Sequence, residues 1–309
     1  MNVNVPHFLD VDDLSSSELR EVLERARDWK ASPGDVPPLL EHRSVAAVYQ
    51  KPSVRTRVSF EVAVHTLGGH CVSLQGEEVG VGTRESPADV ARTLASFCSV
   101  IGARVFDHRM LEEMARAAGV PVLNLLSDRA HPGQAVGDLL TLEERLGPPL
   151  EGRRLAFVGD GNNVAGSLAV AAALTGLEMV VASPPGYELD DAVVERARNL
   201  GGVVELVSDP YDAVAGADAV YTDVWASMGQ EDEAAARRAA FAPYQVGAPL
   251  LAAAQPDAVF LHCLPAHRGE EVTDEVIEGP SSAVWQQVEN RMHSYRALVA
   301  HLLGGKTAP

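Results

Sequence analysis

The stretch QKPSVRTRV places Lys51, Arg55 and Arg57 close together in a chain whose net charge is −18. It lies between a predicted buried strand, residues 44–50, and a predicted helix. Free N–H groups at a helix start, with hydroxyl and guanidinium groups nearby, favour an anion. The spacing is not that of the GxxxxGK[ST] nucleotide loop, so we expect a phosphate or acyl phosphate rather than a triphosphate. The alternative is that the arginines only pair with nearby carboxylates.

Further polar clusters follow the other predicted strands, where ligands of parallel sheets bind. They are Arg104–His108, His131–Gln134, Asp160–Asn163, Asp223–Gly229 and the stretch HCLPAHRGE that begins at His262.

The motif HPGQ places His131 and Gln134 on one face at a predicted helix start, with Pro132 at its first position. Both side chains can donate to a carbonyl oxygen and orient a small planar group. The alternative is a His–Pro pair that only begins a helix.

The stretch FVGDGNNVAG does not have the GxGxxG spacing of a dinucleotide site, although it has glycines after a predicted strand. Asn162 and Asn163 can instead bond a ligand that bears a carboxylate, or simply form an Asx turn. Asp223 ends a predicted strand before ASMG, where its carboxylate suits an ammonium group. Together these groups suit an amino acid, although Trp225 and Met228 would more often be packing residues.

Cys263 is the last residue of a predicted apolar strand and is a buried inert thiol unless a base activates it. The neighbouring His262 and His267 do not complete a standard zinc spacing, so we predict no metal and no cofactor. Arg291 falls in the last predicted helix, where an arginine ordinarily lies on the solvated face.

The chain length, composition and net charge restrict the class of protein. At 309 residues, with 46 % apolar and 22 % charged residues, the chain suits two soluble domains. The net charge of −18 argues against a nucleic-acid or anionic-membrane partner. Three cysteines without a CxxC pair, no signal peptide and no long apolar run predict a cytoplasmic protein.

Strands alternate with helices along the chain, which predicts an α/β fold of two doubly wound domains, each a parallel sheet flanked by helices. A Pro/Gly-rich break at residues 147–153 separates the two series. Ser15 and Glu18 form a capping box before the first helix, and the last helix covers residues 283–303.

In this order, S-x-R-T-R, H-P-x-Q, G-D-x-N-N, D-x-x-x-S-M-G and H-C-L-P resemble the aspartate/ornithine carbamoyltransferase family, from about residue 7 to residue 303. SMG and HCLP are typical of its ornithine branch. The resemblance implies transfer of the carbamoyl group of carbamoyl phosphate to the δ-amino group of L-ornithine, giving citrulline and phosphate. It also implies a homotrimer or a multiple of trimers, and domains at 1–146 with 284–303 and at 147–283, with the active site in the cleft.

The resemblance implies three sets of site residues. Those expected to bind carbamoyl phosphate are Ser53, Val54, Arg55, Thr56, Arg104, His131, Gln134, Cys263, Leu264 and Arg291. Those expected to take part in catalysis are Arg104, His131, Gln134, Cys263 and Arg291. Those expected to bind ornithine are Asn163, Asp223, Ser227 and Met228.

Some positions carry separate expectations. Val54 replaces a threonine, which we expect to weaken phosphate binding by about one neutral hydrogen bond, on the order of 1 kcal/mol. Gly137 stands where alanine is usual in the family, and Arg57 is closer to structural support. Arg84 falls in a loop that can reach a neighbouring subunit's site in a trimer.

Three alternatives remain open. The acceptor could be another amine, such as putrescine or an N-acylated ornithine. The chain could be a dinucleotide-dependent dehydrogenase, or a non-catalytic paralogue. The direction of flux, anabolic or catabolic, and the general base also stay open.

Overall fold

The computed structural model describes residues 5–226 and 231–304. The chain divides into two compact units. Unit 1 comprises Met1–Leu140 and Glu289–Pro309, and unit 2 comprises Thr141–Val288.

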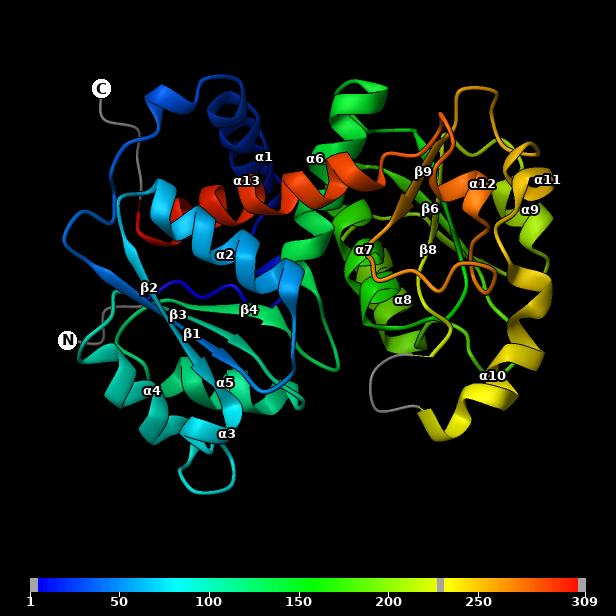
Figure 1. Cartoon of the computed structure of the whole chain (residues 1–309). Helices are drawn as coiled ribbons and strands as arrows, with labels where there is room; N and C mark the ends of the chain where they lie inside the picture. Colours follow the sequence, from blue (N-terminus) through cyan, green and yellow to red (C-terminus); the bar gives the residue numbers. More distant parts are fainter. Residues whose placement is uncertain (1–4, 227–230, 305–309) are drawn as a thin grey trace. The chain divides into compact units, whose positions relative to one another are not determined.

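Unit 1 contains a sheet of four parallel strands in the order β2-β1-β3-β4. Its strands are β1 (Ser44–Tyr49), β2 (His70–Gln75), β3 (Val100–Arg104) and β4 (Val122–Leu126). Its helices are α1 (Ser16–Ala31), α2 (Val54–Thr66), α3 (Gly76–Val79), α4 (Pro87–Ala95) and α5 (His108–Ala117), together with parts of α6 (Pro132–Leu146) and α13 (Val284–Leu302). The helices α2 and α13 lie over one face of the sheet, and α4 and α5 lie over the other (Figure 1).

The central strands of unit 1 are apolar because helices cover both of their faces. The burial of β1 begins at its second residue and continues to Tyr49, and β3 is buried throughout. The helix α1 begins where Ser15 and Glu18 cap each other reciprocally, which confirms the predicted capping box.

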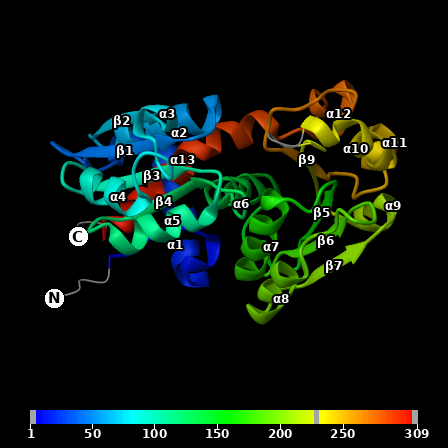
Figure 2. The same cartoon turned by 90° about the horizontal axis from the view of Figure 1, so that it is seen from below.

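Unit 2 contains five parallel strands in the order β7-β6-β5-β8-β9. They are β5 (Arg154–Val158), β6 (Glu178–Ala182), β7 (Val204–Val207), β8 (Ala219–Thr222) and β9 (Val259–His262). Its helices are α7 (Asn163–Thr175), α8 (Asp191–Asn199), α9 (Pro210–Val214), α10 (Ala234–Phe241), α11 (Ala248–Leu251) and α12 (Asp274–Ile277). The helices α7 and α8 cover one face of this sheet, and α9 to α12 lie on the other side (Figure 2).

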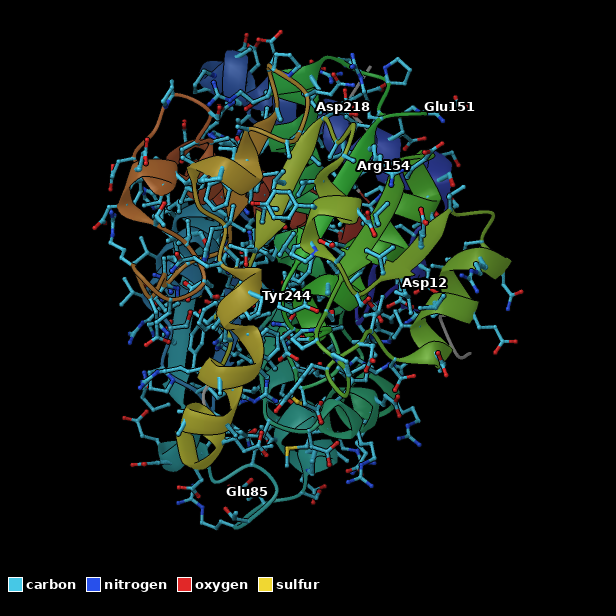
Figure 3. The ribbon with its side chains drawn as sticks, turned by 90° about the vertical axis from the view of Figure 1, so that its right-hand side faces the viewer. Asp12, Glu85, Glu151, Arg154, Asp218 and Tyr244 are labelled. Carbon is cyan, nitrogen blue, oxygen red and sulfur yellow. The ribbon has the colours of Figure 1, made fainter. Side chains whose placement is uncertain are left out.

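Asp218 joins the starts of two neighbouring strands of unit 2. Its carboxylate accepts hydrogen bonds from the Arg154 backbone N–H at 2.8 Å and from the Arg153 guanidinium at 2.9 Å. Figure 3 labels Asp218 and Arg154 at this end of the sheet. The opposite, carboxyl end of the strands carries the polar clusters, as the topology requires.

The predicted α/β class with two parallel sheets is confirmed. Short helices such as α4, α9, α11 and α12 were not predicted. None of the helices in the described part of the chain is both long and apolar enough to span a membrane.

Candidate active site

In unit 1 the helix α2 begins with the predicted anion-binding motif. Ser53 is its N-cap, and the Ser53 hydroxyl accepts a hydrogen bond from the Thr56 backbone N–H at 3.3 Å. Val54 is the first helical residue, and its side chain is 76 % exposed. Arg57 pairs with Glu61 at 2.8 Å, which agrees with a structural role for Arg57. The first turn of α2, which contains Arg55, therefore has the backbone N–H groups that favour an anion.

Arg291 on α13 is buried, contrary to the expectation that an arginine in this helix faces solvent. Its Nη2 donates a hydrogen bond to the Thr56 hydroxyl at 2.6 Å. The bond connects two segments of unit 1 that are far apart in the sequence, α13 and the start of α2. The solvated-face expectation is wrong because this part of α13 packs within unit 1 rather than at its surface.

Arg104 ends β3 and is buried beside other cations. Burial, and after it the positive charges of Arg291 and Arg55, lower the pKa of Arg104 to about 10. An anion placed among these three guanidinium groups would relieve both effects.

His131, directly before α6, has a pKa well below its ordinary value. The causes are burial first and then the charges of Arg291, Arg104 and Arg55. His131 is therefore neutral at physiological pH and can serve as a neutral hydrogen-bonding group beside the cations.

Gln134, in the first turn of α6, is oriented by a buried carboxylate. Its Nε2 donates to Asp138 Oδ1 at 2.7 Å. Its Oε1 is buried and accepts no hydrogen bond from the described residues. Gln134 therefore offers an acceptor to an N–H group, whereas the sequence had predicted mainly a donor.

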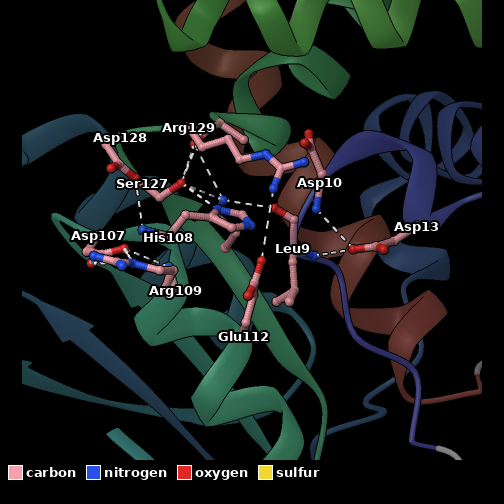
Figure 4. A network of polar contacts seen from close by, with 12 residues as sticks. Leu9, Asp10, Asp13, Asp107, His108, Arg109, Glu112, Ser127, Asp128 and Arg129 are labelled. Atoms are coloured by element: carbon pink, nitrogen blue, oxygen red, sulfur yellow. Dashed lines mark hydrogen bonds and ion pairs between the residues drawn. The ribbon is translucent and has the colours of Figure 1, made fainter. Parts of the chain in front are cut away.

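A polar hollow of about 490 Å³ lies beyond the ends of β3 and β4 in unit 1. Its residues are Phe106, Asp107, His108, Arg109, Glu112, Asp128 and Arg129. His108 Nδ1 lies 2.8 Å from the Ser127 hydroxyl, and Asp107 faces Arg109 (Figure 4). Because these charges pair among themselves, we assign the anion site to the start of α2 rather than to this hollow.

In unit 2 Asp223 is held by three neutral donors. Its Oδ2 accepts from Asn162 Nδ2 at 2.8 Å, and its Oδ1 accepts from the Val224 N–H at 2.8 Å and from the Cys263 thiol at 3.0 Å. Within residues 5–226 and 231–304, no lysine or arginine forms an ion pair with Asp223. No cationic side chain of the described residues therefore neutralises this carboxylate, which suits a cationic ligand.

The structure assigns different places to the two asparagines. Asn162 is the N-cap of α7 and bonds Asp223, whereas the predicted ligand residue, Asn163, is the first residue of the helix. Sequence reasoning considered Asn162 but did not connect it with Asp223. Ser227 and Met228 lie outside the described residues.

Arg237 on α10 fixes the segments on either side of this site and was not predicted from the sequence. Its Nη1 donates to Asp160 Oδ2 at 3.0 Å and to the Trp225 carbonyl at 2.9 Å. Its guanidinium also lies 4.9 Å from the centre of the Tyr187 ring. Because Asp160 precedes Asn162 and Trp225 follows Asp223, this one side chain holds both segments.

Cys263 and Leu264 follow β9, which ends at His262, one residue before the predicted end. His262 Nδ1 accepts from the Leu264 N–H at 2.9 Å, so its Nε2 carries the proton toward Glu271 Oε1 at 3.0 Å. Asp223, His262 and Cys263 have potential ligand atoms within 4.8 Å of one another. Both nitrogens of His262 are already engaged, which leaves too few ligands for a structural zinc site.

Comparisons with known proteins place both halves of the chain in one family. Residues 6–144 match the family model described as the carbamoyl-P binding domain of aspartate/ornithine carbamoyltransferase, and residues 151–302 match that of its Asp/Orn binding domain. The chain is 52 % identical to the ornithine carbamoyltransferase of Acidothermus cellulolyticus, over 99 % of this chain and all of that protein. It is 48 % identical to the anabolic ornithine carbamoyltransferase of Pyrococcus furiosus, over 96 % of each chain.

Solved structures agree with these matches. The structure of the ornithine carbamoyltransferase from Pyrococcus furiosus superposes with a TM-score of 0.92 at 47 % identity, covering 97 % of this chain and 98 % of that one. The structure of a mutant N-acetyl-L-ornithine transcarbamylase superposes with a TM-score of 0.86 at 31 % identity, covering 96 % of this chain and 99 % of that one. By sequence and by fold, the chain belongs to the aspartate/ornithine carbamoyltransferase family.

Proposed function

We propose that this protein transfers the carbamoyl group of carbamoyl phosphate to the δ-amino group of L-ornithine, forming citrulline and phosphate. The observation that carries the proposal is the cluster in unit 1, where Arg291 bonds Thr56 and where the charges of Arg291, Arg104 and Arg55 lower the pKa of the buried His131. Membership of the family agrees with it.

The residues of the unit 1 cluster suit different parts of carbamoyl phosphate. The N–H groups of α2, with Arg55 and Arg104, suit the phosphate oxygens. Arg291 and His131 suit the carbamoyl oxygen, where negative charge grows in a tetrahedral transition state. The Gln134 oxygen suits the carbamoyl N–H group, because its own amide nitrogen is bonded to Asp138.

The unit 2 cluster supports an α-amino acid as acceptor. The Asp223 carboxylate suits the α-ammonium group of ornithine, and Asn163 at the α7 N-terminus suits its α-carboxylate. The uncharged δ-amine attacks the carbamoyl carbon, the C–O bond to phosphate breaks, and the proton that the nitrogen loses departs with the phosphate. Catalysis then depends on positioning and electrostatic stabilisation, without a covalent enzyme intermediate.

An acceptor other than ornithine is the second candidate. Putrescine lacks an α-carboxylate, and an N-acylated ornithine lacks the α-ammonium group that Asp223 suits. The relatives named ornithine carbamoyltransferase reach 52 % identity, against 31 % for the N-acetyl-L-ornithine transcarbamylase structure. The free amino acid is therefore favoured.

The test is citrulline formation from carbamoyl phosphate and ornithine, with putrescine, N-acetylornithine and aspartate as competing acceptors. We expect turnover with ornithine alone. Turnover with another amine only would overturn the acceptor assignment and keep the phosphate assignment. The absence of product with every acceptor would favour a non-catalytic protein.

We also propose that the chain assembles as a homotrimer, as expected from its family resemblance. A stripe of valines on α2 supports an interface there, since Val54, Val58 and Val62 are 76 %, 55 % and 40 % exposed at a spacing of four residues. Arg84, whose side chain is 65 % exposed, would then be able to reach a neighbouring copy. Such a stripe is costly in water and is typical of a surface that another chain covers.

Sedimentation tests the assembly. We expect a species of three chains of 32.8 kDa each, and we expect Val58→Asp to dissociate it. Val203→Asp is the matched control, because Val203 is a 56 % exposed valine that belongs to unit 2 and not to α2. A wild-type protein that sediments as one chain would contradict the proposal.

A further inference from the structure

Gly133 lies between His131 and Gln134, in the first turn of α6. A Cβ atom built on this glycine would lie 2.4 Å from Cε1 of Tyr295 and 2.9 Å from its hydroxyl oxygen. Carbon atoms that are not bonded prefer separations of about 3.5–4.0 Å. The Tyr295 ring therefore occupies the volume that any side chain at position 133 would need.

The ring of Tyr295 cannot move aside freely. It is fully buried, and the Phe60 ring of α2 packs edge-on against it with the ring centres 5.5 Å apart. The guanidinium carbon of Arg291, one turn earlier on α13, lies 6.0 Å from the ring centre. Tyr295, which lies on α13 with Arg291, thus contacts the two other helices that carry Thr56 and Gln134.

The hydroxyl of Tyr295 adds a second, independent observation. It is buried and has no hydrogen-bond partner among the described residues. A phenylalanine would fill the same volume without burying an unsatisfied polar group. The hydroxyl is therefore a buried donor that the described residues do not use, and it lies against Gly133, between His131 and Gln134.

We propose that Tyr295 is a further residue of the carbamoyl phosphate site. Its ring, seated against Gly133, holds the α6 start with His131 and Gln134 at a fixed distance from Arg291. Its hydroxyl donates a hydrogen bond to the bound carbamoyl phosphate. The inference rests on the proposed function. It explains the glycine at position 133 by the space that the Tyr295 ring occupies, rather than by a need for backbone flexibility.

The first test measures the dissociation constant of carbamoyl phosphate by titration calorimetry without acceptor. We expect Gly133→Ala to weaken binding by about tenfold or more, since displacement by a fraction of an ångström disturbs an aligned site. In the Tyr295→Val background the same change should weaken binding by less than about twofold, because the ring is gone. Gly137→Ala is the matched control: its Cβ would stay 3.5 Å from Arg291, and binding should not change.

The second test isolates the hydroxyl with Tyr295→Phe. We expect roughly threefold to tenfold weaker binding of carbamoyl phosphate, the effect of one neutral hydrogen bond. The melting temperature should stay the same or rise, which a purely structural role of the hydroxyl would not give. Tyr211→Phe removes an exposed hydroxyl in unit 2 and should change neither quantity.

Two results would overturn the inference. One is a Gly133→Ala effect of equal size in both backgrounds, and the other is unchanged binding in Tyr295→Phe. Failure of the proposed function is a different outcome: in that case the wild-type protein forms no citrulline with any acceptor. The calorimetric comparison of positions 133 and 295 does not depend on turnover.

Discussion

At Asp223 both carboxylate oxygens accept hydrogen bonds from neutral donors, Asn162, Val224 and Cys263. This arrangement fixes the carboxylate without neutralising it. We expect Asp223→Asn to raise the KM for ornithine by about a hundredfold, because a hydrogen bond to a charged group contributes up to about 3 kcal/mol. The affinity for carbamoyl phosphate should stay within twofold of wild type.

The control for this prediction is Asp212→Asn, which removes an exposed carboxylate from α9 in the same unit. Steady-state kinetics with each substrate varied in turn would separate the two affinities. An Asp223→Asn variant with an unchanged ornithine KM would show that the ammonium group binds elsewhere.

The ion pair of Asp160 and Arg237 predicts a pH dependence at the residue scale. Burial raises the pKa of Asp160 to about 6, although the Arg237 charge opposes this rise. As the pH falls through about 6, the carboxylate takes up a proton and its charge pairing with Arg237 is lost. We therefore expect the ornithine KM to rise below about pH 6, and Asp160→Asn to remove that step.

Unfolding caused by protonation of Asp160 cannot explain weaker ornithine binding below pH 6, because this protonation stabilises the folded protein. The folded-state pKa lies above the ordinary value of 3.8, so the folded protein binds this proton more tightly than the unfolded chain. The Asp160 contribution to the free energy of unfolding therefore falls as the pH rises from about 4 to about 6. Urea unfolding of wild type and Asp160→Asn across this range measures the difference.

At the scale of elements, α1 and α2 allow a matched comparison of two helix caps. Ser15 caps α1 and Ser53 caps α2, each through its side-chain oxygen. We expect Ser15→Ala and Ser53→Ala each to lower the free energy of unfolding by about 1 kcal/mol. Only Ser53→Ala should also weaken carbamoyl phosphate binding, since only the start of α2 carries the anion motif. Equal carbamoyl phosphate affinities of the two variants would show that the Ser53 cap does not belong to the ligand site.

The strands and long helices were predictable because their apolar patterns extend over many residues. The strand β1 ends one residue before the predicted end, and α13 begins at Val284, one residue after the predicted start. Short helices such as α11 and α12 have four residues each, too few for a helical period to be recognised. Their positions depend on packing within unit 2, which cannot be predicted from the local sequence.

The motifs identified most candidate site residues but not the contacts among them. The pairing of Thr56 with Arg291 joins positions 235 residues apart, and no local pattern predicts it. Asn162, Arg237 and Tyr295 were missed as partners for the same reason. The glycine inside HPGQ permits a close approach by another residue, but only the structure shows that this residue is Tyr295.

At the scale of the whole molecule, the two units carry different charges at their candidate sites. The cations lie in unit 1 and the acceptor carboxylate lies in unit 2. We expect inorganic phosphate alone to slow amide hydrogen exchange in peptides that contain residues 53–57, 104 and 131–134. Peptides that contain residues 160–163 and 223 should keep their exchange rates, as mass spectrometry can measure. Protection of the unit 2 peptides by phosphate would contradict the assignment.

The guanidinium cluster that lowers the pKa values of Arg104 and His131 also has a consequence for turnover. In the proposed reaction the departing phosphate leaves from the same cations that bound it as part of the substrate. The protein should therefore be slowed by its own product, and a phosphate buffer should act as a competitor of carbamoyl phosphate. Cations that bind the phosphate of the substrate tightly also release the phosphate product slowly.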